Sequence, residues 1–287
     1  MLSLILGKPL SLKEVLVIEL SSYQLEDLDT SPHIAVVTNL FPEHMDHHGG
    51  LASYYAAKKN ITRFQTQADV LLLGVKNAEL AQWARETRAR VLYPQKKLPL
   101  PLKQTRLIGE HNASNIRLAL ACAKLFGVTP KNAIEVLQNF QPLPHRMQKV
   151  GTFSGITFYD DAISTTPEST IAALQSLPKI STLFLGGQDR GYDFSNLEAF
   201  IRKSDVKNIV LFPDTGNKMF RKVPAGIKIL RTGSMKDAVR FAYDETSVGR
   251  GVLLSTASPS YSLWKNFEVK GKEFQKFVRF FGHTSAK

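Results

Sequence analysis

Short apolar runs alternate with stretches of helical periodicity along the chain. In the first half these runs are continuous, which is typical of strands that are buried on both faces. The predicted strands are VLVIEL (15–20), HIAVVTNL (33–40) and DVLLLG (69–74), and the predicted helices cover 51–65, 78–86, 112–126 and 130–138. Two prolines in FQPLPHRMQKV then indicate a domain junction near residues 140–145.

A second series of strands and helices follows this junction. Its predicted strands are ITFYDD (156–161), STLFLGG (181–187), NIVLFPD (208–214) and GVLLSTA (251–257), and its predicted helices cover 167–177, 196–203, 235–243 and 262–280. Such alternation predicts the α/β class, with a mostly parallel sheet and helices on both of its faces. The 287 residues suffice for two domains, which we place at 1–144 and 145–287.

Composition narrows the class of protein. Apolar residues make up 43% of the chain, and no apolar run reaches the ~18–20 residues that cross a membrane. The start, MLSLILGKPL, lacks the basic region of a signal peptide, and the single cysteine, Cys122, is compatible with a reducing compartment. The net charge of +12 is dispersed, without a dense basic tract. We therefore expect a cytoplasmic monomer that binds neither nucleic acid nor membranes.

Ligands of parallel α/β sheets bind at the carboxyl ends of the strands. The residues at those positions are Glu19, Asn39 to Asp46, Asp160 and Asp161, and Gly186 to Arg190. Glu19 suits a hard cation held with phosphate oxygens. Alternatively, Ser21 or Ser22 caps a helix over SYQLEDL, and Glu19 is a charge at its start.

Two further segments carry candidate ligands. EHMDHHGG (43–50) holds two carboxylates and three histidines within six residues. This spacing is too tight for the segment to form a tetrahedral zinc site by itself. The segment therefore either contributes ligands to a shared site or is a polar loop. Helical spacing predicts that Lys58 points inward, on the face of Tyr54 and Ile61, whereas Lys59 faces solvent. A surface position is the alternative for Lys58.

Two polar patterns remain. Asn112 and Asn115 lie three residues apart at the start of a predicted helix, where asparagine is a favoured cap and where two amides can also read a purine edge. LGGQDRGYDF (185–194) is a glycine-rich turn that presents Asp189 and Arg190. It matches neither GxGxxG nor GxxxxGK[ST], so the chain has no dinucleotide fingerprint and no Walker loop.

Eight segments resemble, in order and approximate spacing, motifs of the Mur ligase family. They are ELSSYQLE, TNLFPEHMD, AAK, GEHNASN, LPHRM, YDDAISTTPEST, LGGQDRGYDF and LLSTASPSYSLWKNFEVKGKEF. The resemblance covers about residues 15–281 and is strongest to the branch that joins D-glutamate to UDP-N-acetylmuramoyl-L-alanine. It implies a ligase of peptidoglycan synthesis, with part of a central ATP-binding domain followed by a Rossmann-like carboxyl-terminal domain.

The resemblance also implies the reaction and its cofactors. ATP phosphorylates the substrate carboxylate, the amine of D-glutamate attacks the acyl phosphate, and two Mg²⁺ ions offset the negative charge. The implied residues for metal binding and catalysis are Glu19, His44 and a carbamoylated Lys58, and those for ATP are Asn112, Asn115, Arg146 and Asp161.

For D-glutamate the resemblance implies four residues of the second domain. They are Thr165, Arg190, Ser260 and Phe267, which offer the cation and hydroxyls that an acidic amino acid requires. Arg190 stands where many members have lysine, so the charge is kept. Ala162 replaces the family's usual serine, and Ile163 stands where some members have lysine, which argues against polar roles at these two positions.

The front of the chain departs from the family pattern. Members carry a UDP-binding domain and a GxxGK[ST] loop before the segment that matches ELSSYQLE, whereas GKPLSL is not such a loop. We therefore expect the chain to be inactive by itself, and a separate N-terminal half is one candidate partner. Another Mur-type or folylpolyglutamate synthase-like ligase is the enzymatic alternative, although no DNPR-like motif is present. The non-enzymatic alternative is a nucleotide- or partner-binding module.

Overall fold

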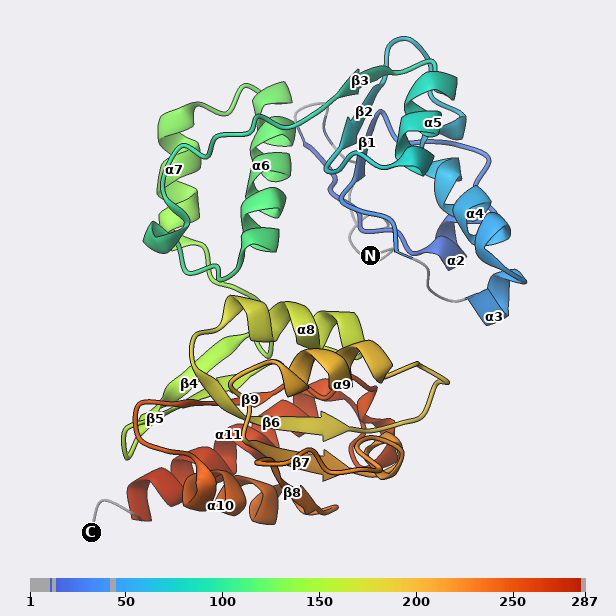
Figure 1. Ribbon diagram of the computed structural model, residues 1–287. Coiled ribbons are helices and arrows are strands. Elements are labelled where there is room, and N and C mark those ends of the chain that lie inside the picture. The colour runs from blue at the N-terminus through green and yellow to red at the C-terminus, as the bar shows by residue number, and fades with distance from the viewer. Residues whose placement is uncertain (1–10, 12–13, 42–44, 285–287) are drawn as a thin grey trace. The chain divides into compact units, whose positions relative to one another are not determined.

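The computed structural model describes residues 11, 14–41 and 45–284 (Figure 1). Its contacts divide the chain into two compact units, one of residues 1–97 and 114–128 and the other of residues 98–113 and 129–287. The domain boundary predicted after residue 144 remains a prediction, because compactness does not measure independent folding. Among the described residues, no helix is long and apolar enough to cross a membrane.

The first unit is built on a three-stranded parallel sheet in the order β1-β2-β3. Its elements are α2 (Ser22–Leu25), β1 (Ile34–Val37), α3 (Met45–His48), α4 (Leu51–Arg63), β2 (Val70–Leu73), α5 (Ala78–Glu86) and β3 (Arg90–Leu92). The central strand β2 is buried at every position, as its uninterrupted apolar run predicted. Leu71 and Leu73 of β2 pack with Leu80 and Trp83 of α5, so the core lies between the sheet and this helix.

The strand predicted at 15–20 is wrong. The segment forms no regular element, and the side chains of Val15 to Ile18 are 39–89% exposed. A strand requires a neighbour for its backbone hydrogen bonds. In the described residues the sheet pairs only β1 with β2 and β2 with β3, so an apolar run here has no ladder to join.

The second unit contains a six-stranded sheet in the order β4-β5-β9-β6-β7-β8, in which only β4 is antiparallel to its neighbour. Its strands are β4 (Gln148–Phe153), β5 (Ile156–Asp160), β6 (Ile180–Gly186), β7 (Asn208–Phe212), β8 (Lys228–Arg231) and β9 (Gly251–Leu254). Its helices are α7 (Pro130–Asn139), α8 (Pro167–Ser176), α9 (Ser195–Arg202), α10 (Met235–Glu245) and α11 (Phe267–Thr284). Helix α6 (Glu110–Leu125) begins in this unit and continues in the first.

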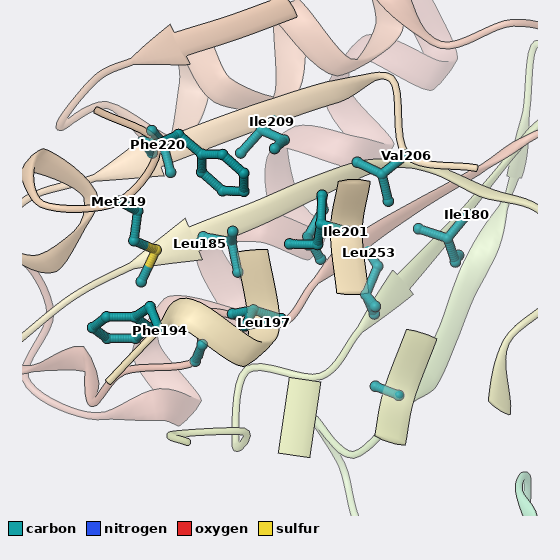
Figure 2. Close-up of a cluster of buried hydrophobic side chains, with 14 of the residues drawn as sticks. Ile180, Leu185, Phe194, Leu197, Ile201, Val206, Ile209, Met219, Phe220 and Leu253 are labelled. Atoms are coloured by element: carbon teal, nitrogen blue, oxygen red, sulfur yellow. The ribbon is translucent and has the colours of Figure 1, made fainter. Parts of the chain in front are cut away.

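Both faces of this sheet are covered by helices (Figure 1). Side chains alternate along each strand, so Leu183 and Leu185 of β6 join the core beneath α8 and α9, whereas Phe184 joins the core beneath α10 and α11. Figure 2 shows the first of these cores, where Leu197 and Ile201 of α9 pack against the strands. Burial on both faces explains why the central strands read as continuous apolar runs.

Candidate active site

Three parallel strands end side by side in the middle of the six-stranded sheet. Strand β9 lies between β5 and β6, so the loops that follow these strands meet at one edge. At this edge Asp160 and Asp161 are 0% and 2% exposed. Buried carboxylates are costly unless hydrogen bonds and charges surround them, so their neighbours define the site.

Asp161 accepts three hydrogen bonds. Its Oδ2 accepts from the hydroxyls of Ser164 at 2.6 Å and Ser255 at 2.8 Å, and its Oδ1 accepts from the backbone N–H of Met147 at 3.1 Å. Burial nevertheless raises the pKa of Asp161 to about 6, because desolvation outweighs these bonds and the attraction of the Arg146 charge. The carboxylate therefore changes its protonation state close to neutral pH.

Asp160 connects the chain before β4 to helix α11. Its Oδ2 lies 2.7 Å from Nδ1 of His145 and accepts from Nε2 of Gln275 at 2.8 Å, and its Oδ1 accepts from the backbone N–H of Ala162 at 3.0 Å. His145 and Gln275 are themselves buried. Asp160 is thus held by three hydrogen-bond partners from different parts of the chain.

The two aspartates hold a strained turn. His145 and Met147 have φ angles of 62° and 44°, in the left-handed region. A non-glycine residue there costs about 1–3 kcal/mol and persists where the surroundings fix it. Asp160 holds the ring of His145, and Asp161 holds the amide of Met147. Arg146, between the two strained residues, is exposed and therefore projects from a rigid turn.

Lys270 is the unexpected member of the site. It lies on α11, is 0% exposed, and donates from Nζ to Oγ1 of Thr256 at 2.5 Å. Burial lowers the pKa of Lys270 to about 7, and the negative charges of Asp160 and Asp161 oppose that shift. A buried ammonium group is tolerated where such counter-charges and hydrogen bonds compensate it.

The residues implied for D-glutamate occupy the same edge. The ring of Phe267, the first residue of α11, lies 6.2 Å from that of His145, edge to face. Thr165 is half-buried, between Ser164 and the cap of α8. Ser260 is 4% exposed, and the described part of the chain offers its Oγ no hydrogen-bond partner. A buried hydroxyl without a partner is unusual and favours a ligand there.

The loop after β6 contacts the loop after β9. The backbone N–H of Gln188 donates to the carbonyl of Pro259 at 2.8 Å, which places Arg190 and Ser260 in joined loops. A Cβ on Gly187 would lie 2.2 Å from that carbonyl oxygen, so only glycine permits this approach. Asp189 forms an ion pair with Lys218, whereas Arg190 is exposed.

In the first unit, His44 lies outside the described residues. Glu19 is exposed, and Ser21 caps α2 through a capping box with Gln24, so the predicted helix cap is present. Lys58 is half-buried, with Nζ 5.4 Å from the ring centroid of Tyr54, on the face that helical spacing predicted. Lys59 does not simply face solvent, because it forms an ion pair with Glu86.

The other two histidines of EHMDHHGG contact a residue that the sequence did not single out. Nε2 of His47 lies 2.9 Å from Oε1 of Glu26, and Nδ1 of His48 lies 3.0 Å from Oε2. The three side chains have a spacing that also suits a metal ion. Donation from both rings to the one carboxylate already satisfies Glu26, so we interpret the cluster as hydrogen-bonded.

The two asparagines lie inside a helix and not at its cap. Helix α6 begins at Glu110, before both residues. Asn112 is buried and its Nδ2 donates to the carbonyl of Ile108 at 2.7 Å, whereas Asn115 is exposed. The capping alternative is therefore wrong, because the chain enters the helix two residues before Asn112.

Comparison with known proteins decides the family. Residues 4–98 match the model of the Mur ligase middle domain. Over 308 residues the chain is 33% identical to the UDP-N-acetylmuramoylalanine--D-glutamate ligase of Symbiobacterium thermophilum, covering 95% of this chain and 68% of that enzyme. The chain belongs to the Mur ligase family. Its resemblance to the D-glutamate-adding branch, inferred from eight motifs, is thereby confirmed.

A second relative shows how much of the family's length this Mur ligase chain spans. The ligase of the same name from Leuconostoc citreum is 36% identical over 286 residues, covering 93% of this chain and 63% of that enzyme. The chain thus spans less than two thirds of that relative. Among solved structures, MurF of Thermotoga maritima in complex with ADP is similar with a TM-score of 0.66 at 14% identity, over 88% of this chain and 63% of that one. This likeness confirms the predicted α/β class.

Several buried residues of the site were not identified from the sequence, among them the hydroxyl residues Ser164, Ser255 and Thr256 that bond Asp161 and Lys270. Lys270, His145 and Gln275 are the others. A signal for Lys270 was present, because Lys270, Phe274 and Val278 recur at helical spacing and all prove to be 0% exposed. A lysine on an otherwise apolar helix face indicates a buried counter-charge. His145 and Gln275 carry no such local pattern, since Asp160 brings them together across the fold.

Proposed function

We propose that this Mur ligase chain carries nucleotide and amino-acid sites for the ATP-dependent joining of D-glutamate to UDP-N-acetylmuramoyl-L-alanine, in the cytoplasm. The relatives named above support the reaction class, because they carry the name of this ligase. The proposal assigns the amino-acid site to the loops after β5, β6 and β9. Substrate, partner and location are inferences from family membership together with the chemistry at this sheet edge.

The observation that carries the proposal is the buried hydroxyl of Ser260, which finds no hydrogen-bond partner among the described residues and lies beside the loop of Arg190. A free amino acid brings several hydrogen-bonding groups, and an acidic side chain adds a second carboxylate. Arg190 offers that carboxylate a planar pair of donors, and Ser260 supplies a hydroxyl within the same joined loops. Thr165 and Phe267 complete the proposed set.

For ATP we propose Arg146 and Asp161, with Asn112 and Asn115 near the base. The fixed turn that presents Arg146 supports its role, because an exposed guanidinium held in place is suited to phosphate oxygens. Transfer of the γ-phosphoryl group to the substrate carboxylate forms the acyl phosphate and ADP. The amine of D-glutamate then attacks the acyl carbon, phosphate leaves with the bonding electrons, and the amine loses a proton.

For the two magnesium ions we propose Glu19, His44 and Lys58. Magnesium prefers oxygen ligands, which Glu19 offers directly. Lys58 offers them only after its neutral amine adds carbon dioxide and releases a proton, which makes an anionic carbamate. Its half-buried position beside Tyr54 is compatible with that group. When bound, the ions offset the charge that phosphoryl transfer brings together.

The test is an amino-acid panel. A chimera in which these 287 residues replace the matching part of the Leuconostoc citreum enzyme is assayed beside the 287-residue chain alone, each with MgATP and UDP-N-acetylmuramoyl-L-alanine. Phosphate release is measured with D-glutamate, L-glutamate, L-lysine, diaminopimelate and D-alanyl-D-alanine.

We expect the chimera to release phosphate with D-glutamate far above every other addition. Preference for another amino acid would point to a different Mur-type ligase. Substrate-independent nucleotide binding without turnover would favour the binding-module alternative.

A further inference from the structure

Two buried polar atoms of the candidate site have no hydrogen-bond partner in the part of the chain that the structure describes. One is the hydroxyl oxygen of Ser260, which the proposed function uses, and the other is the side-chain oxygen Oε1 of Gln188, which it does not. Gln188 lies in the loop after β6, two residues before Arg190. We propose that this oxygen accepts a hydrogen bond from the amine of the incoming amino acid, so that Gln188 binds and orients the nucleophile.

The backbone on either side of Gln188 is held by the two neighbouring loops. The N–H of Gln188 donates to the carbonyl of Pro259 at 2.8 Å, and Ser260 is the next residue of that loop. The preceding residue, Gly187, accepts at its carbonyl from the N–H of Thr215 at 3.0 Å and donates its own N–H to Oγ1 of Thr215 at 3.1 Å. The loops after β6, β7 and β9 therefore hold the side chains of Gln188 and Ser260 on adjoining segments.

The side chain of Gln188 is half-buried, and its oxygen is the shielded end. A shielded acceptor without a donor is rare in a folded protein, because the oxygen has lost its water and gained nothing in return. The terminal torsion of a glutamine side chain has broad minima, so the amide group can turn toward a ligand while the backbone stays in place. A ligand that supplies a donor removes this cost, and the gain adds to its affinity.

The chemistry of the ligand selects which of its groups meets Gln188. D-glutamate carries two carboxylates, which only accept hydrogen bonds, and one amine, which donates them. The oxygen of Gln188 therefore matches the amine. Arg190 is exposed in the same loop and has donors only, so it matches a carboxylate. This division of donors and acceptors fixes the direction in which the amino acid lies along the loop.

An acceptor is also the group that the reaction requires beside this nitrogen. The amine attacks the acyl phosphate through its lone pair, and a hydrogen-bond donor would occupy that lone pair. The oxygen of Gln188 instead binds an N–H and leaves the lone pair free. Because the amide of Gln188 is neutral and is not a base near neutral pH, it holds the amine and takes no proton from it.

This role of Gln188 rests on the proposed function, because the amine belongs to the proposed substrate. The test compares D-glutamate with glutarate, which has the same two carboxylates and lacks the amine. In the chimera, with MgATP and UDP-N-acetylmuramoyl-L-alanine saturating, kcat/KM for D-glutamate and the inhibition constant of glutarate are measured. The variants are Gln188→Met, which keeps the length of the side chain without the amide, and Gln188→Glu, which keeps an acceptor oxygen. Gln175→Met, at an exposed position of α8, is the matched control.

We expect Gln188→Met to lower kcat/KM for D-glutamate about tenfold or more, while glutarate inhibits within about twofold of its value for the parent. Gln188→Glu should retain more activity than Gln188→Met, and Gln175→Met should match the parent. If Gln188→Met failed to fold, Gln188→Ala would replace it with the same expected result. Activity of Gln188→Met within about threefold of the parent would overturn the proposal. An equal loss for D-glutamate and glutarate would also overturn it, because the loop as a whole would then have been disturbed.

Failure of this role and failure of the proposed function give different results. If the chimera used D-glutamate and Gln188→Met behaved as the parent, the role of Gln188 would be wrong and the proposed function would stand. If the chimera preferred another amino acid, the D-glutamate proposal would fail. A loss specific to the amine of that amino acid, relative to its deaminated analogue, would then still support the role of Gln188. No turnover with any amino acid would overturn both.

Discussion

Gly271 follows Lys270 on α11, where the backbone of the helix packs against the pair formed by His145 and Asp160. A Cβ at this position would lie 2.1 Å from Nδ1 of His145 and 2.7 Å from Oδ2 of Asp160. Both distances are far below van der Waals contact, and both partners are buried. The substitution Gly271→Ala must therefore displace the imidazole and break its 2.7 Å contact with Asp160.

The expected cost follows from these contacts. Overpacking a buried site costs about 1–3 kcal/mol. A buried group that loses its hydrogen bond costs about 1–3 kcal/mol more. Alanine regains about 1 kcal/mol through its higher helix propensity. We therefore expect Gly271→Ala to lower the free energy of unfolding by about 1–5 kcal/mol, with a weaker affinity for MgADP.

Urea unfolding followed by circular dichroism measures this change. The control is Gly233→Ala, where an added Cβ would meet only Leu263 at 3.8 Å and should alter stability by less than about 0.5 kcal/mol. If Gly271→Ala proved as stable as Gly233→Ala, the close packing of α11 on the His145–Asp160 pair would be incorrect.

Three further predictions concern the core, the buried acid and the surface. Leu183 is 0% exposed in the middle strand β6, so Leu183→Ala should lower the free energy of unfolding by about 3–5 kcal/mol in urea titrations. The folded pKa of Asp161 lies above the ordinary aspartate value of 3.8, so proton binding adds stability that is complete below pH 3.8 and lost as the pH rises through about 6. Relative to Asp161→Asn, the parent should therefore gain about 1–2 kcal/mol between pH 8 and pH 5. Lys59→Ala removes a partly exposed ion pair with Glu86 and should change the thermal midpoint of unfolding by no more than a few degrees.

The central strands could be predicted from the sequence because a strand that is buried on both faces consists of consecutive apolar residues. β2, β6, β7 and β9 are buried at every position, so each reads as an apolar run. The edge strands β4 and β8 were missed, since their exposed faces carry polar residues such as Lys149 and Lys228. The error at 15–20 was the reverse, because the run is apolar but lacks a pairing neighbour among the described residues.

The start of the helix expected over 262–280 was also predicted incorrectly. It begins at Phe267, after a short 3₁₀ turn at Ser260–Ser262. Ser260 is buried in that turn, and the spacing of apolar residues does not predict either the turn or the burial. Asp161 and Arg146 were identified as candidate site residues because they lie in the family motifs YDDAISTTPEST and LPHRM. The contacts of Asp160 with His145 and Gln275 could not be predicted, because they join residues 15 and 115 positions apart.

The central claim is that this sheet edge accepts an acidic amino acid, and Arg190 tests it most directly. In the chimera, kcat/KM for D-glutamate is measured for the parent, Arg190→Lys and Arg190→Met. A carboxylate that loses a charge-assisted partner on closure of the site costs about 2–4 kcal/mol, which is roughly 30- to 1000-fold in kcat/KM. We expect Arg190→Met to lose activity in that range through weaker use of D-glutamate, with Arg190→Lys retaining more and MgATP use unchanged. Activity of Arg190→Met within about threefold of the parent would contradict the account.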